Sequence, residues 1–192
     1  MGIVDSFKET VAFFEAIREE GFIVDYALIG GLALSAWVRP RTTRDVDLIV
    51  AISEQTAWNE LAAVIETKLH KKVALQKGTQ RTNIKEKLSF VAGQIEVDVI
   101  GAKGFDLASE AIRHAVSAKV FDMKVKVVTP EYLILLKLLP LSDQDIVDIK
   151  TLLKKADIKR LIPLAQRHFL LPKLERVMSE KKKAIRKQGP SR

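Results

Sequence analysis

One short stretch, LIGGLALSAWVRPRTTRDVDLIV, constrains the fold of this chain more than any other part of the sequence. The apolar, β-branched run over residues 22–29 predicts a strand that ends at Gly30 and Gly31, and the residues that follow favour a helix. Residues 45–52 (DVDLIVAI) predict a second strand, which begins with an Asp-x-Asp pair. The glycines therefore occupy a strand-to-helix turn in a chain that mixes strands and helices.

The two aspartates of the pair, Asp45 and Asp47, share one face of the predicted strand because side chains alternate along it. Val46, Leu48 and Val50 form the opposite, apolar face and are expected in the core. In a strand the Cα atoms of the two aspartates are about 6.5–7 Å apart. Carboxylates at this separation can bind one divalent cation, or two cations about 3.5–4 Å apart.

A later predicted strand repeats this arrangement. In QIEVDVI, residues 94–100, three apolar side chains form one face, whereas Glu96 and Asp98 lie on the other. We expect Asp98 to complete a three-carboxylate metal site. Glu96, on the same face, is the alternative third acid.

The ligand types in the chain restrict the cation. There is no cysteine, and the three histidines (His70, His114 and His168) are far apart in the sequence, so thiolate and imidazole metal sites are not expected. Carboxylates favour a hard ion, Mg²⁺ or Mn²⁺. Mg²⁺ is usually held by few carboxylates together with the phosphates of a substrate.

The glycine turn suits such a phosphate-bearing substrate. Without Cβ atoms, Gly30 and Gly31 let backbone N–H groups at the start of a helix approach a phosphate closely. Arg39, Arg41 and Arg44 add positive charge beside the turn. These features together predict a nucleoside triphosphate (NTP) as substrate.

The same motifs resemble those of the nucleotidyltransferase superfamily related to DNA polymerase beta. The string Arg41-x-Thr43-x-Asp45-x-Asp47 after the glycines is similar to a branch that contains toxins of bacterial toxin–antitoxin pairs and antibiotic nucleotidyltransferases. The resemblance implies an α+β fold, in which a small mixed β-sheet is flanked by helices and followed by a helical C-terminal part. It also implies transfer of a nucleoside monophosphate from the NTP to a hydroxyl group, with release of pyrophosphate.

The resemblance extends to single positions. Relatives with a helical C-terminal part have a lysine on the helix after a Thr-Pro-Glu turn, which Lys137 matches, and an acidic motif that Asp145 and Asp148 match. Many relatives have a serine next to the glycine pair, whereas this chain has Leu32 there and Ser35 a helical turn later. The implied catalytic and metal-binding residues are Asp45, Asp47 and Asp98. The implied nucleotide-binding residues are Gly30, Gly31, Ser35, Arg41, Thr43, Arg44 and Lys137.

Several functions remain open on the sequence. The hydroxyl acceptor is an RNA end, a protein side chain or a small molecule, and the chain is a candidate toxin with an antitoxin protein as partner. The alternative is a non-catalytic module of the same fold that binds a nucleotide or a partner. Pyrophosphate release in the presence of Mg²⁺ distinguishes the two.

The remaining pattern predicts the organisation of the chain. A nucleotidyltransferase core is expected over residues 1–128, a helical segment over residues 129–180 and a basic, disordered tail over residues 181–192. The further predicted helices cover residues 6–21, 53–70, 107–117 and 130–139, and most of the chain from residue 142. The further predicted strands cover residues 72–76, 87–91, 94–100 and 124–129, the middle two joined as a hairpin.

The charge is uneven along the chain. Residues 181–192 contain six basic residues and no acid, so the rest of the chain holds only +2 of the net charge of +8. Such a segment either solubilises the protein or contacts RNA or another polyanion. No apolar run approaches the roughly 18–20 residues of a membrane span, and residues 1–20 lack a secretory-signal pattern, so we expect a cytoplasmic protein with no membrane partner.

Overall fold

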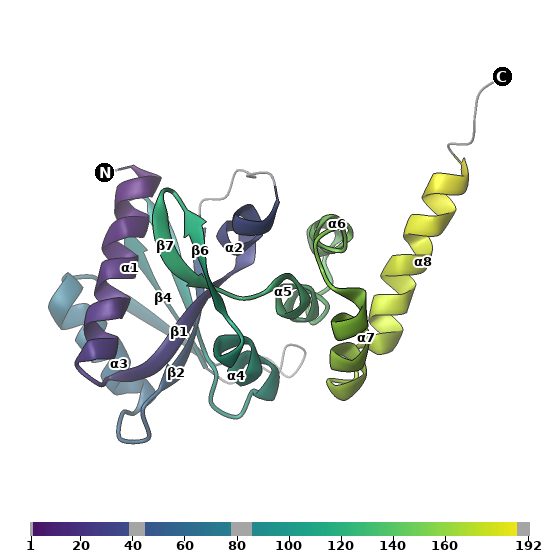
Figure 1. Ribbon diagram of the computed structural model, residues 1–192. Helices are drawn as coiled ribbons and strands as arrows, with labels where there is room; N and C mark the ends of the chain where they lie inside the picture. The colour runs from purple at the N-terminus through teal and green to yellow at the C-terminus, as the bar shows by residue number, and fades with distance from the viewer. Residues whose placement is uncertain (1, 39–44, 78–85, 188–192) are drawn as a thin grey trace.

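The computed structural model describes residues 2–38, 45–77 and 86–187, with the side chains described up to residue 179. The described strands form one mixed sheet in the order β3-β4-β5-β2-β1-β7-β6 (Figure 1). This confirms the expected α+β class with a mixed sheet flanked by helices. The strands are β1 (Ile23–Ile29), β2 (Asp45–Ile52), β3 (Val73–Lys77), β4 (Glu86–Ala92), β5 (Ile95–Gly101), β6 (Val116–Val120) and β7 (Met123–Val127).

The helices lie on both faces of the sheet and beyond one side of it (Figure 1). One face packs against the first and third helices, and the other packs against the second and fourth over the β1 and β2 side. The last three helices stack on one another away from the sheet. The helices are α1 (Ile3–Glu19), α2 (Gly30–Trp37), α3 (Trp58–Leu69), α4 (Asp106–Arg113), α5 (Pro130–Lys137), α6 (Asp143–Leu152), α7 (Ile158–Arg167) and α8 (Leu171–Lys187).

Alternation along the central strands builds the core. Val46, Leu48 and Val50 on β2 are buried, as expected, on the face that α1 covers. On the same face Tyr26 of β1 contacts Phe14 of α1, with ring centroids 5.6 Å apart. The opposite face of β2 and β5 is therefore left to carry the acidic residues.

The pairing of strands places the acids side by side. β2 and β5 are parallel neighbours, and Asp47 pairs with Asp98 while Asp45 pairs with Glu96. β4 and β5 form the expected hairpin, in which Ser89 lies opposite Asp98. Acidic side chains far apart in the sequence thus share one face at the border of β2 and β5.

One helix was expected to be longer, and the strand after it was missed. The helix expected over residues 107–117 ends at Arg113, and Val116–Val120 forms β6, an edge strand in which Ser117 pairs with Lys126 of β7. No glycine or proline marks this boundary in the sequence. The β-branched valines of β6 find partners in β7, and this tertiary pairing overrides the local helical pattern.

Two helix starts also differ from the prediction. α1 begins at Ile3 instead of Ser6, because the Asp5 carboxylate accepts a hydrogen bond from the Gly2 N–H (3.2 Å). α3 begins at Trp58, since residues 53–56 form a turn closed by hydroxyl groups instead of the first turn of a helix.

At the C-terminus, α8 continues to Lys187, seven residues past the expected boundary at residue 180. The residues of this extension (KKKAIRK) are mostly good helix formers, so the basic composition does not by itself end the helix. Among the described helices, none is long and apolar enough to cross a membrane.

A polar cluster joins the C-terminal helices to the core. Glu110 of α4 accepts hydrogen bonds from Tyr132 of α5 (3.2 Å) and contacts His168 at the end of α7 (3.2 Å). His114 stacks on Tyr132, with centroids 5.3 Å apart. Burial would raise the pKa of Glu110, but the His168, Tyr132 and Arg167 contacts outweigh it and lower that pKa. His114 and His168 therefore help to hold the C-terminal helices against the core.

Candidate active site

The turn between β1 and α2 depends on Gly30. Its φ is +66°, and a Cβ added there would lie 1.9 Å from Oδ2 of Asp47. No other residue fits without moving that carboxylate. Ile29 pairs with Asp47 in the β1–β2 ladder, so the turn and the second aspartate are in direct contact.

The N-terminus of α2 faces the same place with its backbone N–H groups. Its N-cap, Ile29, provides no capping side chain, and the first turn contains no acid. The first N–H groups of a helix have no intrahelical partner and carry partial positive charge. This helix start is therefore suited to an anionic group such as phosphate.

Asp47 is largely buried beside two other carboxylates. Burial, and then the charges of Asp98 and Asp45, raise the pKa of Asp47 to about 6. Lys137 and Lys87 act in the opposite direction. The raised pKa shows that burial, together with the two neighbouring carboxylates, disfavours the charged form of Asp47.

Asp98 is held by two residues of β4. Lys87 Nζ lies 2.7 Å from Asp98 Oδ2, and Ser89 Oγ donates to Asp98 Oδ1 at 2.6 Å. Both residues are on the acidic face because of the hairpin register. Sequence reasoning missed them, although counting back from the β4–β5 turn places Ser89 opposite Asp98.

Lys137, at the end of α5, lies between two aspartates of α6. Its Nζ is 3.1 Å from Asp145 Oδ1 and 2.8 Å from Asp148 Oδ2. Asp145 also accepts a hydrogen bond from Ser142 Oγ (2.6 Å), and Gln144 donates to Asp148 (2.9 Å). These bonds fix the ammonium group on one wall of the site.

A cavity of about 400 Å³ brings these groups together. Its sheet wall, as we call it, contains Gly30, Gly31, Asp45 and Asp47, and its helix wall contains Lys137, Asp145 and Asp148. Apolar side chains, including Phe105 and Leu133, complete the lining. Residues from β1, α2, β2, α5 and α6 thus converge on one space.

The predicted site residues fall into three groups. The glycines, Asp45, Asp47 and Lys137 line the cavity, and Asp98 adjoins Asp47 on the neighbouring strand. Ser35 is not among the described lining residues, because it lies a turn further along α2 and its hydroxyl donates to the Gly31 carbonyl (3.2 Å). Arg39, Arg41, Thr43 and Arg44 lie outside the described residues.

The fit of a divalent cation can be judged from these charges. Burial and then the neighbouring carboxylates raise the pKa of Asp47, and a bound cation would favour its charged form, so the carboxylates suit a hard metal ion. Within the described residues, however, no three acidic or histidine side chains are grouped closely enough to hold a metal. Asp98 is instead directed toward Lys87 and Ser89.

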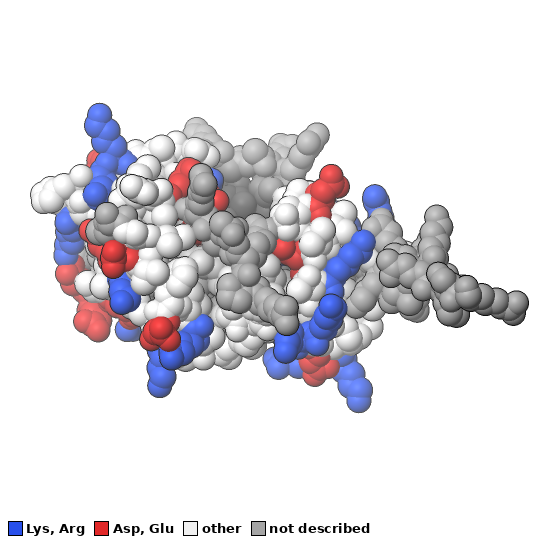
Figure 2. All heavy atoms as spheres, turned by 90° about the horizontal axis from the view of Figure 1, so that it is seen from above, with Lys and Arg blue, Asp and Glu red and all other residues white. Residues whose placement is uncertain are grey.

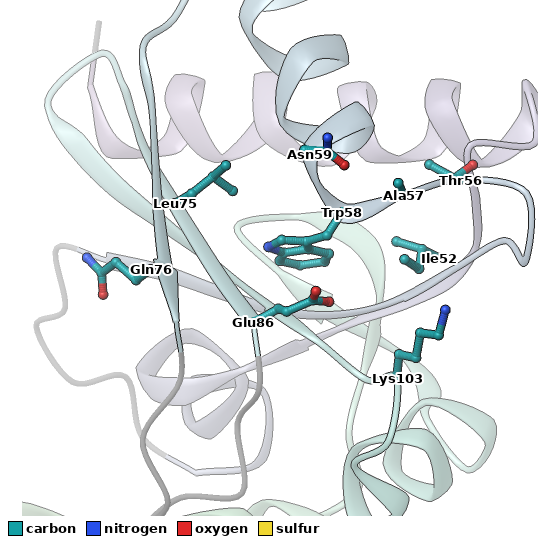
Figure 3. Close-up of a pocket in the computed structure, with 9 residues that line it drawn as sticks. All are labelled: Ile52, Thr56, Ala57, Trp58, Asn59, Leu75, Gln76, Glu86 and Lys103. Carbon is teal, nitrogen blue, oxygen red and sulfur yellow. The ribbon is translucent and has the colours of Figure 1, made fainter.

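A second cavity, of about 490 Å³, lies on the other face of the sheet at the far end of β2 (Figure 3). The Trp58 indole lies between Leu75, Ile52 and Glu86, and Lys103 stands at the opposite rim (Figure 3). A Cβ at Gly101 would lie 3.2 Å from the indole. This cavity contains none of the acids of the active-site cavity and is separate from it.

A sheet that carries a glycine turn and paired acids beside a lysine-bearing helix has the architecture of a nucleotidyltransferase. Two solved structures share the fold. An antigenic nucleotidyltransferase-like protein from Paracoccidioides brasiliensis is 18% identical, with a TM-score of 0.55 over 91% of this chain and 93% of that chain. The antibiotic-resistance factor ANT(2'')-Ia is 15% identical, with a TM-score of 0.53 over 93% of this chain and 98% of that chain.

The family is shown by a sequence profile. The profile of the nucleotidyl transferase AbiEii toxin family, of type IV toxin–antitoxin systems, matches residues 12–187. The chain therefore belongs to this family and is a nucleotidyltransferase, in agreement with the resemblance seen in the motifs. No curated protein matches the chain in a sequence comparison.

Proposed function

We propose that this chain is a metal-dependent toxin that transfers a nucleoside monophosphate from an NTP to the hydroxyl group of an RNA. One observation carries the proposal: a single cavity joins a phosphate-suited helix start, the Asp45–Asp47 pair and the partly buried Lys137. We place the activity in the cytoplasm, where NTPs are available, with an antitoxin protein as its genetic partner.

In this proposal the two walls of the cavity have different tasks. The N–H groups of Gly31 and the residues after it bind the triphosphate, and Lys137 approaches it from the helix wall. Asp45 and Asp47 would hold Mg²⁺ or Mn²⁺, and Asp98 would join them if its carboxylate turned away from Lys87. A bound divalent ion would neutralise the phosphate charge and lower the pKa of the acceptor hydroxyl.

In the proposed transfer, one bond to the α-phosphorus forms as another breaks. The acceptor oxygen forms a bond to the α-phosphorus of the NTP, and the bond from that phosphorus to the β-phosphate oxygen breaks. Pyrophosphate leaves with the electron pair of the broken bond. The hydroxyl proton passes to a base at the site, for which Asp98 is our candidate because it lies on the strand next to Asp47.

Charge at the C-terminal helices favours RNA among the acceptors. Lys and Arg side chains gather over these helices, with fewer acids among them (Figure 2). The exposed basic residues include Lys154, Lys155, Lys159, Arg160 and Arg176. A surface of this kind binds phosphates without sequence preference and with a strong dependence on salt.

The second candidate is a non-catalytic nucleotide-binding module of the same fold. It is favoured by the glycine turn, where Leu32 stands in place of the serine common in relatives and is buried. Ser35 does not replace that serine, since its hydroxyl is bonded to Gly31. Without that hydroxyl, the turn itself contacts phosphate through its backbone N–H groups.

Incubation of the full chain with each labelled NTP, Mg²⁺ and total RNA separates the candidates. Transfer predicts labelled RNA and one pyrophosphate per label, both lost in Asp45→Asn and when the metal is chelated. Binding of NTP without release of pyrophosphate in the presence of any acceptor, whether RNA, protein or antibiotic, would support the non-catalytic module.

Residues 181–192 provide a second test of the acceptor. If it is RNA, deleting this segment should weaken RNA binding and flatten its log–log salt dependence by about 0.7 per lost phosphate contact on a single strand. RNA affinity that does not change with the deletion at low or moderate salt would remove this reason for choosing RNA.

A further inference from the structure

A second groove, of about 380 Å³, adjoins the carboxylates on the side away from the helix wall. Ser89, Val91 and Glu96 line it from β4 and β5, and Lys71 and Lys72 line it where the chain enters β3. We call it the β3–β5 groove. It is distinct from the active-site cavity and from the Trp58 cavity on the opposite face.

Strand pairing shows that the groove and the acids share one face. Asp47 pairs with Asp98, Asp98 with Ser89, and Ser89 with Ala74, so these four residues form one row across β2, β5, β4 and β3. Three strand spacings separate the ends of the row, about 14 Å. The row therefore leads from the metal-binding acids to the edge of the sheet.

Asp98 lies at the junction of the two spaces. Asp47, its partner on β2, lines the active-site cavity, whereas Ser89, which donates to its carboxylate, lines the β3–β5 groove. A molecule in the groove would thus approach Asp98 from the side opposite the nucleotide. In-line displacement requires an acceptor in this position, facing the α-phosphate from the side opposite the leaving group.

Charge changes sign along the groove. Glu96 and Asp98 stand at the end near the metal-binding acids, whereas His70, Lys71 and Lys72 are consecutive at the far end. His70 ends α3 with φ +54°, and this left-handed residue turns the chain so that both lysines border the groove. Val91, which is 55% exposed, offers an apolar surface between the two ends.

We propose that the β3–β5 groove holds the last few nucleotides of a single-stranded RNA acceptor, with the terminal hydroxyl at Asp98 and the preceding phosphates at Lys71 and Lys72. This inference rests on the proposed transfer function and adds the path of the acceptor. The groove is open, and its lysines lie about three strand spacings from the acids. A strand-like polyanion spans that distance, whereas a small acceptor bound at the acids would not reach the lysines.

Photo-crosslinking maps this path directly. An RNA with 4-thiouridine two nucleotides from its 3′ end is irradiated with the full-length chain, NTP and Mg²⁺, and the crosslinked peptide is identified by mass spectrometry. We expect peptides that contain residues 71–74 or 89–91. Crosslinks confined to α6–α8, or to the helix wall, would overturn the proposed path.

A charge-matched pair of variants measures the lysine contacts. Lys71→Ala/Lys72→Ala should weaken binding of a short single-stranded RNA about tenfold or more at moderate salt and reduce the salt slope by about 1.4. Lys8→Ala/Lys124→Ala removes the same charge from exposed positions on α1 and β7 and should change affinity less than twofold. If both double variants lose the same RNA affinity, the groove is not a specific RNA site and the proposal is overturned.

NTP binding distinguishes failure of the groove from failure of the proposed function. Both pairs should bind NTP with wild-type affinity, because neither touches the active-site cavity. If the wild type releases pyrophosphate with RNA, and the Lys71→Ala/Lys72→Ala variant binds RNA as well as the wild type does, only the proposed groove is contradicted. If the wild type releases no pyrophosphate with RNA, both the groove and the proposed function are contradicted. If it releases pyrophosphate only with a small molecule or a protein, RNA is excluded as the acceptor.

Discussion

The sheet wall and the helix wall of the active-site cavity both contain aspartates, but the groups around those aspartates differ. On the helix wall, Asp145 and Asp148 share the ammonium group of Lys137. On the sheet wall, Asp47 lies between Asp45 and Asp98, and its pKa is raised to about 6. The aspartates of the helix wall thus have a described cation within contact distance, whereas Asp47 is surrounded by other carboxylates and by buried surface. This difference is the basis for proposing a positioning role for the helix wall and a metal-binding role for the sheet wall.

The largest effect is expected from replacing Asp47, the aspartate that adjoins both Asp45 and Asp98. Asp47→Asn should reduce transfer by more than about a thousandfold, because it removes the proposed metal ligand at the centre of the acids. The fold should persist, since the substitution also removes like-charge repulsion. Pyrophosphate release measures the activity, and Asp122→Asn, an exposed position, is the matched control. Near-wild-type turnover would refute the metal assignment.

The glycine turn is the next test of the sheet wall. Gly30→Ala places a methyl group where Asp47 Oδ2 now lies, so we expect at least about a hundredfold loss of activity and a loss of about 2 kcal/mol of stability. Gly21→Ala is the control, because Gly21 also has a positive φ (+83°) but no atom within 4 Å of the added Cβ. If the two variants lose equal stability, backbone strain alone explains the destabilisation, and the clash with Asp47 does not contribute to it.

The next effect in size distinguishes Asp98 from Glu96 as the third acid of the site. Asp98→Asn should lower kcat about a hundredfold, whereas Glu96→Gln should change it little, because Asp98 adjoins Asp47 and Glu96 is exposed beside Asp45. Lys87→Met should have an intermediate effect of about tenfold, through the position of Asp98. The reverse order of the two acids would show that Glu96 is the catalytic one.

The parts of this site that the sequence predicts are those encoded by local periodicity. The glycine turn, the shared face of Asp45 and Asp47, and the β4–β5 hairpin all follow from residues close in the sequence. The pairing of Asp47 with Asp98 does not, because β2 and β5 are parallel strands separated by α3, β3 and β4. Alternation alone cannot decide which strands become neighbours.

The helix wall shows the same limit. The Thr-Pro-Glu turn predicts the start of α5, and the helical pattern from residue 142 predicts α6, which Ser142 caps by accepting from the Asp145 N–H (3.2 Å). That Lys137 faces both aspartates depends on how the two helices pack. β6 was missed for a related reason, since its pairing with β7 is a tertiary contact.

A smaller effect on activity is expected from replacing Lys137 on the helix wall. Lys137→Met should raise the KM for NTP about tenfold and lower stability by about 3 kcal/mol, because it leaves two nearly buried carboxylates without a counterion. The triple variant Lys137→Met/Asp145→Asn/Asp148→Asn should regain most of the stability but not the NTP affinity. Recovery of both would assign Lys137 a purely structural role.

The smallest expected effect is the dependence of stability on pH at Asp47. The pKa of about 6 in the folded protein lies above the ordinary value of about 3.9, so folding favours the protonated form. The contribution of this group to stability is present below about pH 4 and is lost as the pH rises through about 6. Asp47→Asn is free of this loss, so its melting temperature should exceed that of the wild type by a few degrees at pH 7.5, and the difference should vanish near pH 4.

Adding Mg²⁺ completes this last test. If the repulsion at Asp47 is what the cation relieves, millimolar Mg²⁺ should raise the wild-type melting temperature at pH 7.5 and leave Asp47→Asn unchanged. The metal should therefore close the gap between the two proteins at pH 7.5 and have little effect on either at pH 4, where the carboxyl group is protonated. A gap that does not depend on pH, or Mg²⁺ stabilisation that is equal in both proteins, would show that the charge on the sheet wall is balanced elsewhere in the molecule.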